Sequence, residues 1–228
     1  MNIYYINLDR CDERRKKIQE MYTNLIRVPA YDGGELENYN DINIIPGHDM
    51  DNGEIGCSLS HIRAIYTAYI NGENGALIME DDIYNNFKYL WKEQIPNILC
   101  SIPDKTECIQ LHCINSVVIE DMLLMKTRFS NWRDDSWGAG CYYITRGGME
   151  KIIKKYVRNG IIVLPICIEN KADFNLIYGF LKTVTYTRPL FDHQICNSTI
   201  HTPHLETIHY KALCSICRYF THINSSKL

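Results

Sequence analysis

The chain has 228 residues, of which 46% are hydrophobic and 22% are charged, and its formal net charge at pH 7 is −3. These values are typical of one globular domain, and no basic stripe interleaved with aromatic residues indicates a nucleic-acid partner. The chain contains no run of about 18 apolar residues that could cross a bilayer, and Met1 to Leu8 is too short for a signal peptide. We therefore expect a cytoplasmic protein.

Ten cysteines are scattered through the chain, from Cys11 to Cys217. In a chain without a recognisable export signal, such cysteines usually act as small buried hydrophobic residues and do not form a disulfide framework. We expect free thiols in a reducing compartment.

The chain alternates between strand and helix patterns. Short apolar runs bounded by turn residues predict strands, and apolar residues three or four positions apart predict helices. In chain order, these patterns predict a strand over 2–8, a helix over 10–24, a strand over 25–30, a helix over 55–70, a strand over 75–79, a helix over 87–95, strands over 108–112 and 138–145, a helix over 149–157, a short helix over 174–179, a strand over 182–187 and a helix over 205–220. The polar stretch from Gly34 to Asn52 predicts a loop with little regular structure.

This order of elements favours an α/β domain with a mainly parallel central sheet and helices on both faces. No internal repeat or low-complexity linker divides the chain. We expect one domain over residues 1–203 and a helical extension over 204–228 that packs on it.

An acidic run follows the strand expected over 75–79. Glu80, Asp81 and Asp82 leave the end of that strand, where open α/β sheets bind ligands. Adjacent carboxylates repel one another unless a cation lies among them, and Mg²⁺ or Mn²⁺ prefers oxygen ligands. The run therefore predicts a metal site that neutralises a nucleotide diphosphate. The alternative is a solvated loop at the start of the next helix.

Several sequence blocks occur in the order found in one known family. They are Tyr5-Ile6-Asn7-Leu8-Asp9-Arg10, Arg27-Val28-Pro29-Ala30-Tyr31-Asp32-Gly33, Gly53-Glu54-Ile55-Gly56-Cys57-Ser58-Leu59-Ser60-His61, Ala76 to Asp82, Gly138-Ala139-Gly140-Cys141-Tyr142-Tyr143-Ile144-Thr145, Ala172-Asp173 and Pro189-Leu190-Phe191 with Gln194. With these blocks, the chain resembles glycosyltransferase family 25, the lipooligosaccharide and procollagen galactosyltransferases. The resemblance implies a Rossmann-like GT-A fold. It also implies an inverting transfer of galactose or glucose from a uridine diphosphate (UDP) sugar, with manganese or magnesium as cofactor.

The resemblance also implies roles for individual residues. Asp82 is expected to bind the metal, Asp81 the ribose or the metal, and His193 is a further candidate ligand, with an ordinary surface histidine as the alternative. The early strand ends suggest a nucleotide-sugar contact set of Asn7, Leu8, Arg14, Asp32 and Asp81, to which Gln194 is added from the closing block. Glu54, Ser58 and His61 share one polar helical face, which we expect to border the donor sugar or its phosphates.

An inverting transfer needs a base that removes the proton of the acceptor hydroxyl. Asp173 is the candidate that the resemblance suggests, and helix capping is its alternative role. Asp134 and Asp135, beside Trp132 and Trp137, are competing bases. We expect Trp137 and Asp135 at the acceptor site, where an aromatic face stacks on a sugar ring, although many tryptophans belong to a core.

The helix expected over 205–220 carries two further features. Cys214 and Cys217, with His209 and His222, are potential zinc ligands, but their spacing is unusual and packed thiols are favoured. Its apolar face is expected to pack on the main domain, with a peripheral membrane contact as the alternative.

We expect the acceptor to be a glycan or a hydroxylysine-type protein residue. Two other functions stay open. One is a binding module whose transferase site has decayed, and the other is a metal-dependent phosphohydrolase or nucleotidyltransferase. A hydrolase triad built on Ser58 or Ser60 with His61 is disfavoured, because the chain has no G-x-S-x-G elbow.

Overall fold

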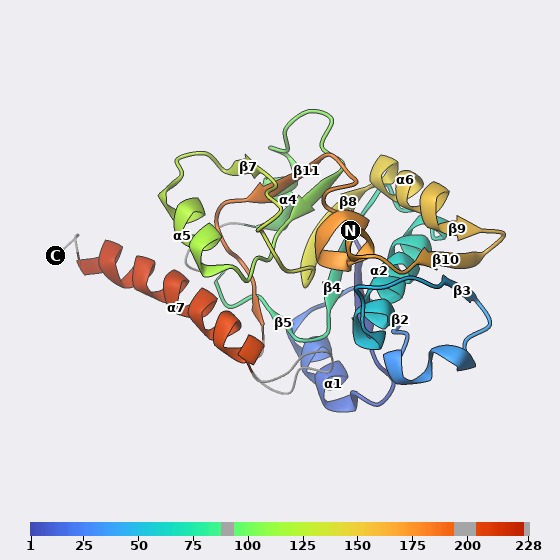
Figure 1. Ribbon diagram of the computed structural model, residues 1–228. Coiled ribbons are helices and arrows are strands. Elements are labelled where there is room, and N and C mark those ends of the chain that lie inside the picture. Colours follow the sequence, from blue (N-terminus) through green and yellow to red (C-terminus); the bar gives the residue numbers. More distant parts are fainter. Residues whose placement is uncertain (88–93, 194–203, 226–228) are drawn as a thin grey trace.

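The computed structural model describes residues 1–87, 94–193 and 204–225. A seven-stranded sheet lies at its centre, in the order β2-β1-β4-β8-β6-β11-β7 (Figure 1). The strands are β1 (Ile3–Asn7), β2 (Leu25–Pro29), β4 (Gly75–Glu80), β6 (Cys108–Gln110), β7 (Phe129–Asn131), β8 (Cys141–Thr145) and β11 (Thr183–Tyr186). Only β7 and β8 run against the other five strands of this sheet. The mainly parallel sheet of the expected GT-A fold is confirmed.

Helices cover both faces of this sheet (Figure 1). They are α1 (Asp12–Met21), α2 (Asn52–Ile70), α4 (Ile95–Leu99) and α6 (Arg146–Tyr156). Side chains alternate across a strand, so Tyr4 and Ile6 of β1 join the core formed with α2 and α6. Tyr5 joins the opposite core, where it packs with Ile18 of α1 and Ile98 of α4.

Two smaller sheets border the central one. The first joins β3 (Ile42–Ile45), β10 (Ile161–Pro165) and β9 (Val157–Arg158), and the second joins β5 (Ile83–Tyr84) to β12 (Asp192–His193). The prediction of an irregular stretch from Gly34 to Asn52 is therefore wrong, since it contains most of the short helical turn η1 (Gly33–Asn38) and all of β3. The partner of β3 is β10, which lies far later in the chain, so no local pattern indicates the pairing.

The helix expected over 87–95 falls largely on residues 88–93, which lie outside the described residues. The helix that follows, α4, begins at Ile95 and carries Pro96 in its first turn. Proline is accepted there because the amide groups of a first turn need no partner inside the helix. Pro96 therefore lies at the start of a helix.

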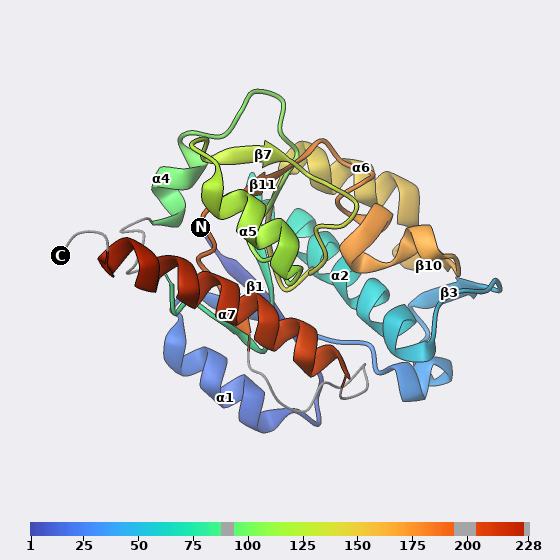
Figure 2. The ribbon, with the colours of Figure 1, turned by 60° about the vertical axis from the view of Figure 1, so that its left-hand side comes forward.

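The C-terminal helix α7 (His204–Ser225) runs alongside α5 (Ser116–Leu124), which the sequence patterns did not predict (Figures 1 and 2). Ala212 and Ile216 of α7 are each 3% exposed and pack with Val118 and Ile119 of α5. The centre of this apolar face is therefore covered by α5, and the suggested peripheral membrane contact stays a prediction. The division of the chain at residue 203 stays a prediction.

Two further observations concern membranes and thiols. Within the described ranges, no helix has both the length and the apolar character needed to cross a bilayer. The nine cysteines that the structure describes are all free thiols, as expected.

Leu59 of α2 provides a test of the main core. Its side chain is fully buried among residues of β1, β4 and α6. We expect Leu59→Ala to lower the free energy of unfolding by about 2–5 kcal/mol, because it removes buried methyl groups and leaves a cavity. Val117→Ala is the control, since Val117 is 62% exposed on α5 and should change stability by about 0.5 kcal/mol or less. Urea denaturation followed by circular dichroism measures the stability of both variants. Equal losses of stability would refute the assignment of Leu59 to the main core.

Candidate functional site

A cavity of about 1090 Å³ opens at the carboxyl ends of β1 and β4. Its walls come from the loop after β1, the first turns of α2, the acidic run, the segment before β8, a turn after β10 and the start of α7. Most of the residues selected from the sequence line it: Asn7, Leu8, Arg14, Asp32, Glu54, Ser58, His61, Asp81, Asp82, Trp137 and Asp173. Tertiary structure thus collects into one site residues that lie far apart in the sequence.

The ends of β1 and β4 position the acidic run. These strands are parallel, with Ile6 opposite Glu80, so Asn7 comes next to Asp81. The Asn7 side-chain amide donates a hydrogen bond to Asp81 Oδ2 at 2.6 Å. Arg27 Nε donates to Asn7 Oδ1 at 2.9 Å, which orients that amide.

Arg14 of α1 is the cation that contacts two carboxylates of the run. Its Nη1 lies 3.1 Å from Asp81 Oδ1 and 3.1 Å from Asp82 Oδ2. Burial, together with the negative charge of Glu80, nevertheless raises the pKa of Asp82 to about 7. Burial also raises the pKa of Asp81, against the opposing effects of Asn7 and Arg14. The negative charge of the run is therefore only partly compensated, and a divalent cation with oxygen ligands fits this donor set.

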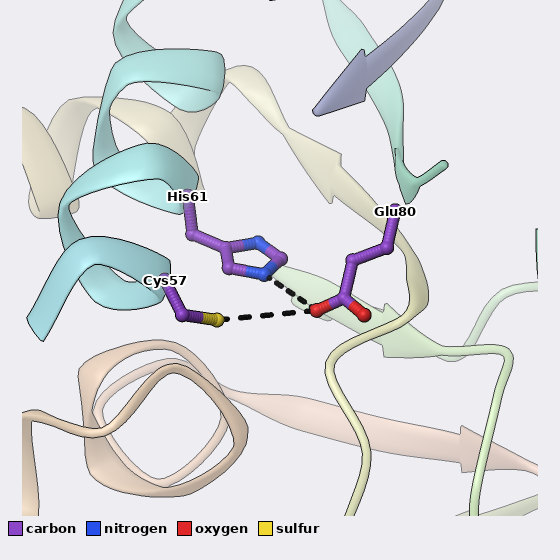
Figure 3. Close-up of side chains that lie close together, drawn as sticks. All are labelled: Cys57, His61 and Glu80. Carbon is purple, nitrogen blue, oxygen red and sulfur yellow. Dashed lines mark hydrogen bonds and ion pairs between the residues drawn. The ribbon is translucent and has the colours of Figure 1, made fainter. Parts of the chain in front are cut away.

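Glu80 points towards Cys57 and His61 of α2 (Figure 3). Its Oε1 lies 3.2 Å from His61 Nε2 and 4.0 Å from Cys57 Sγ. Burial alone would raise the pKa of Glu80, but the hydrogen bond to His61 and the electrostatic effects of His61, His112 and Arg14 together lower it. The acidic run is thus divided, with Asp81 and Asp82 held by β1 and α1 and Glu80 held by α2.

The first turn of α2 is closed by a capping box. Asp51 Oδ1 accepts from the Glu54 amide at 2.8 Å, and Glu54 Oε2 accepts from the Asp51 amide at 3.0 Å. The other oxygen of Glu54 pairs with Lys171 Nζ at 2.5 Å. Glu54 therefore uses its carboxylate to close α2 and to hold the segment that carries Asp173.

Asp173 lies inside the short helical turn η3 (Ala172–Leu176), whose cap position is Lys171. The helix expected over 174–179 is thus placed earlier in the chain, and the alternative role of Asp173 as a helix cap is wrong. Burial raises the pKa of Asp173, and the negative charge of Glu80 raises it further. A carboxylate with a raised pKa that borders a cavity has the character of a proton acceptor.

The two tryptophans have different environments. Trp137 is 42% exposed and lines the cavity. Trp132 packs against the rings of Phe174 and Tyr178, with centroid separations of 6.2 and 6.0 Å. Trp137 is therefore accessible from the cavity, and Trp132 belongs to the core.

Of the two neighbouring aspartates, Asp134 lines the cavity and Asp135 is not among its lining residues. The carboxylate oxygens of Asp135 accept hydrogen bonds from Arg133 at 2.9 and 2.7 Å. Asp135 is thus bound to its neighbour and is less available to an acceptor than Asp134.

Other selected residues have mainly structural partners. Asp32 pairs with Arg10 and accepts from the Gly34 amide at 3.0 Å, which caps η1. Ser58 is fully buried, and its Oγ has no hydrogen-bond partner among the described residues. The side chain of His193 and the whole of Gln194 lie outside the described residues.

Sequence analysis did not select several residues that line this cavity. They are Cys57, His112, Lys171 and Ile208, and His209 was considered only as a potential zinc ligand with Cys214 and Cys217. His112 follows the end of β6, so the rule that ligands bind at strand ends could have identified it. The two α7 residues reach the cavity only through the packing of α7 on α5, which no local pattern indicates.

His112 predicts a pH dependence of stability. Burial lowers its pKa from 6.5 to about 4. Between these values the unfolded chain binds a proton that the folded protein does not, so the contribution of His112 to stability is lost as the pH falls. When the pH is lowered from 7.5 to 5, we expect the free energy of unfolding to fall by about 2 kcal/mol more in the wild type than in His112→Gln. Urea unfolding at both pH values checks this, and equal losses would exclude it.

Comparisons with known proteins give one consistent result. The family model described as glycosyltransferase family 25 (LPS biosynthesis protein) matches residues 1–163. A "Glycosyltransferase 25 family member" of Drosophila pseudoobscura pseudoobscura is 38% identical over 98 residues, which cover 36% of this chain and 16% of that protein. A protein with the same description from Aedes aegypti is 33% identical over 113 residues, which cover 43% of this chain and 18% of that protein.

Among solved structures, the chain is similar to a glycosyltransferase involved in the glycosylation of the major capsid of PBCV-1. The identity is 10% and the TM-score 0.42, over 93% of this chain and 98% of that one. The aligned segments span less than a fifth of the length of the two insect relatives.

Proposed function

The chain belongs to glycosyltransferase family 25, and from this premise we propose that it transfers a hexose, galactose or glucose, from a UDP-sugar to a hydroxyl group. The acceptor is a glycan or a hydroxylysine-type protein residue, and the transfer is metal-dependent and inverting. The observation that carries the proposal is the arrangement of Asp81, Asp82 and Asp173 around one cavity at the strand ends. Asp81 and Asp82 suit the cation that accompanies a donor diphosphate, and Asp173 suits the hydroxyl group of an acceptor.

Asp82 is the main candidate for holding Mn²⁺ or Mg²⁺. Both oxygens of Asp81 already accept hydrogen bonds, one from Asn7 and one from Arg14, whereas Asp82 contacts Arg14 through Oδ2. When bound, the cation neutralises the diphosphate and stabilises the departing phosphate oxygen. In this proposal Arg14 contacts the same phosphates, and Asn7 and Asp81 contact the ribose, because nucleotides bind at the carboxyl ends of such strands.

Asp173 is our candidate base. In an inverting transfer it accepts the proton of the acceptor hydroxyl while that oxygen bonds to the anomeric carbon and the bond to the diphosphate breaks. Its raised pKa brings the carboxylate closer to the pH at which such a base works best. Trp137, exposed at the cavity wall, provides a flat face for the acceptor sugar.

The test is a calorimetric titration of the purified chain with a panel of nucleotide sugars, in manganese and in chelator. The proposal requires binding of a UDP-hexose that needs the metal, followed by release of UDP when an acceptor is added. Binding without release in the presence of glycan and hydroxylysine-peptide acceptors would favour a decayed module. Absence of metal-dependent nucleotide-sugar binding would overturn the proposal.

A further inference from the structure

Three side chains of different ligand types meet on the α2 side of the cavity. Cys57 and His61 are four residues apart on α2, so they share one helix face, and both point towards Glu80 at the end of β4 (Figure 3). One ligand atom from each of the three lies within 4.8 Å of the other two. In the described part of the chain, this is the only such group of three histidine, cysteine or acidic residues.

Two of the three separations lie near those of a zinc site. Zinc binds sulfur at about 2.3 Å, imidazole nitrogen at about 2.0–2.1 Å and carboxylate oxygen at about 2.0–2.2 Å. Two ligands of one tetrahedral ion therefore lie roughly 3.3–3.8 Å apart. The observed 3.2 Å from His61 Nε2 to Glu80 Oε1 and 4.0 Å from Cys57 Sγ to that oxygen lie close to this range. Small side-chain movements would place all three atoms around one ion.

The surroundings supply access and support. Cys57 and Glu80 line the cavity, so an ion can reach them from solvent, and water can fill a fourth position. His61 is 1% exposed, and its Nδ1 lies 3.1 Å from the Tyr142 hydroxyl. A partner on the second ring nitrogen is the usual way in which a protein orients a histidine ligand.

We propose that Cys57, His61 and Glu80 form a zinc-binding site, separate from the Mn²⁺ or Mg²⁺ position at Asp82. Thiolate and imidazole ligands favour Zn²⁺, whereas an all-oxygen set suits Mg²⁺ and Mn²⁺. On binding, the Cys57 thiol releases its proton to water and the sulfur coordinates the ion. Under the proposed function, a second dication next to the acidic run opposes the donor metal, so Zn²⁺ inhibits transfer.

The site is tested without any measurement of activity. Co²⁺, a spectroscopic substitute for Zn²⁺, is added to the reduced, metal-free full chain, and the near-ultraviolet sulfur-to-cobalt charge-transfer absorption is recorded. We expect a band that saturates at one equivalent, that stoichiometric Zn²⁺ abolishes and that excess Mn²⁺ leaves in place. Cys57→Ser should remove the band. The control is Cys11→Ser, because Cys11 is another thiol that lines the cavity, and this variant should keep it.

Each other outcome counts against the site. A wild-type protein without the band overturns the proposal, whether or not the variants fold. A band that survives in a folded Cys57→Ser protein assigns the metal to other thiols. Loss of the band in Cys11→Ser with retention in Cys57→Ser places the metal at Cys11. Since no donor or acceptor is present, failure here is distinct from failure of the transferase proposal.

Discussion

Asp82→Asn is expected to abolish manganese-dependent binding of the donor and to reduce transfer by on the order of 10³-fold or more, since metal stabilisation of a leaving group contributes several kcal/mol. Asparagine keeps the size of the side chain and one oxygen, but it removes the charge that faces the cavity. Calorimetry with the preferred UDP-sugar in manganese and in chelator, together with an assay of released UDP, measures both effects.

The loss in Asp82→Asn should not arise from unfolding. Burial raises the pKa of Asp82 to about 7, so the ionised carboxylate destabilises the metal-free protein at higher pH. We therefore expect the variant to be at least as stable as wild type at pH 8 without metal. Asp104→Asn, at an exposed residue before β6, is the matched control and should keep full activity. Undiminished metal-dependent binding by Asp82→Asn would remove this residue from the metal site.

Asp173→Asn is expected to leave the affinity for the donor unchanged and to lower kcat by about 10²–10⁴-fold, the usual contribution of a general base. The two effects separate because Asp173 belongs to the acceptor side of the proposed mechanism. Donor affinity by calorimetry and single-turnover transfer with a saturating acceptor measure them. Loss of donor binding together with transfer would mean that Asp173 supports the donor site.

Asp134→Asn is the comparison variant for the base, because Asp134 is the competing carboxylate that lines the cavity. We expect its kcat to fall much less than that of Asp173→Asn. The pH–rate profile gives a further check. Burial and the charge of Glu80 raise the pKa of Asp173. As the pH falls and this base is protonated, activity should therefore decline with a midpoint above the pKa of an ordinary aspartate. A larger loss in Asp134→Asn would transfer the role of base to that residue.

Local patterns were sufficient for the parts of the fold that repeat along the chain. Alternating apolar strands and amphipathic helices predicted the central sheet and helices on both faces, and the structure confirms them. The end of β4 marked the acidic run, because the carboxyl ends of parallel strands are where such sheets bind ligands. Asn7 and Asp81 were selected by the same rule, and they form a 2.6 Å hydrogen bond.

Features that depend on distant partners were missed or left open. The pairing of β3 with β10 and the packing of α5 with α7 join segments that no local pattern relates. The sequence suggested Arg14 only as a nucleotide contact, and its position against Asp81 and Asp82 depends on tertiary packing.

The sequence by itself determined which residues carry charge at the strand ends, since strand, turn and acidic run are consecutive. Only the tertiary structure decided where each charge points. Glu80, Asp81 and Asp82 are neighbours in the chain, yet Glu80 faces His61 and Cys57 on α2 while Asp81 and Asp82 face Arg14 on α1. The physical reason is that Glu80 is the last residue of β4 and, by alternation along the strand, shares the α2 side of the sheet with Ala76 and Ile78. Asp81 and Asp82 lie in the turn that follows, where this alternation no longer applies, and both turn to Arg14.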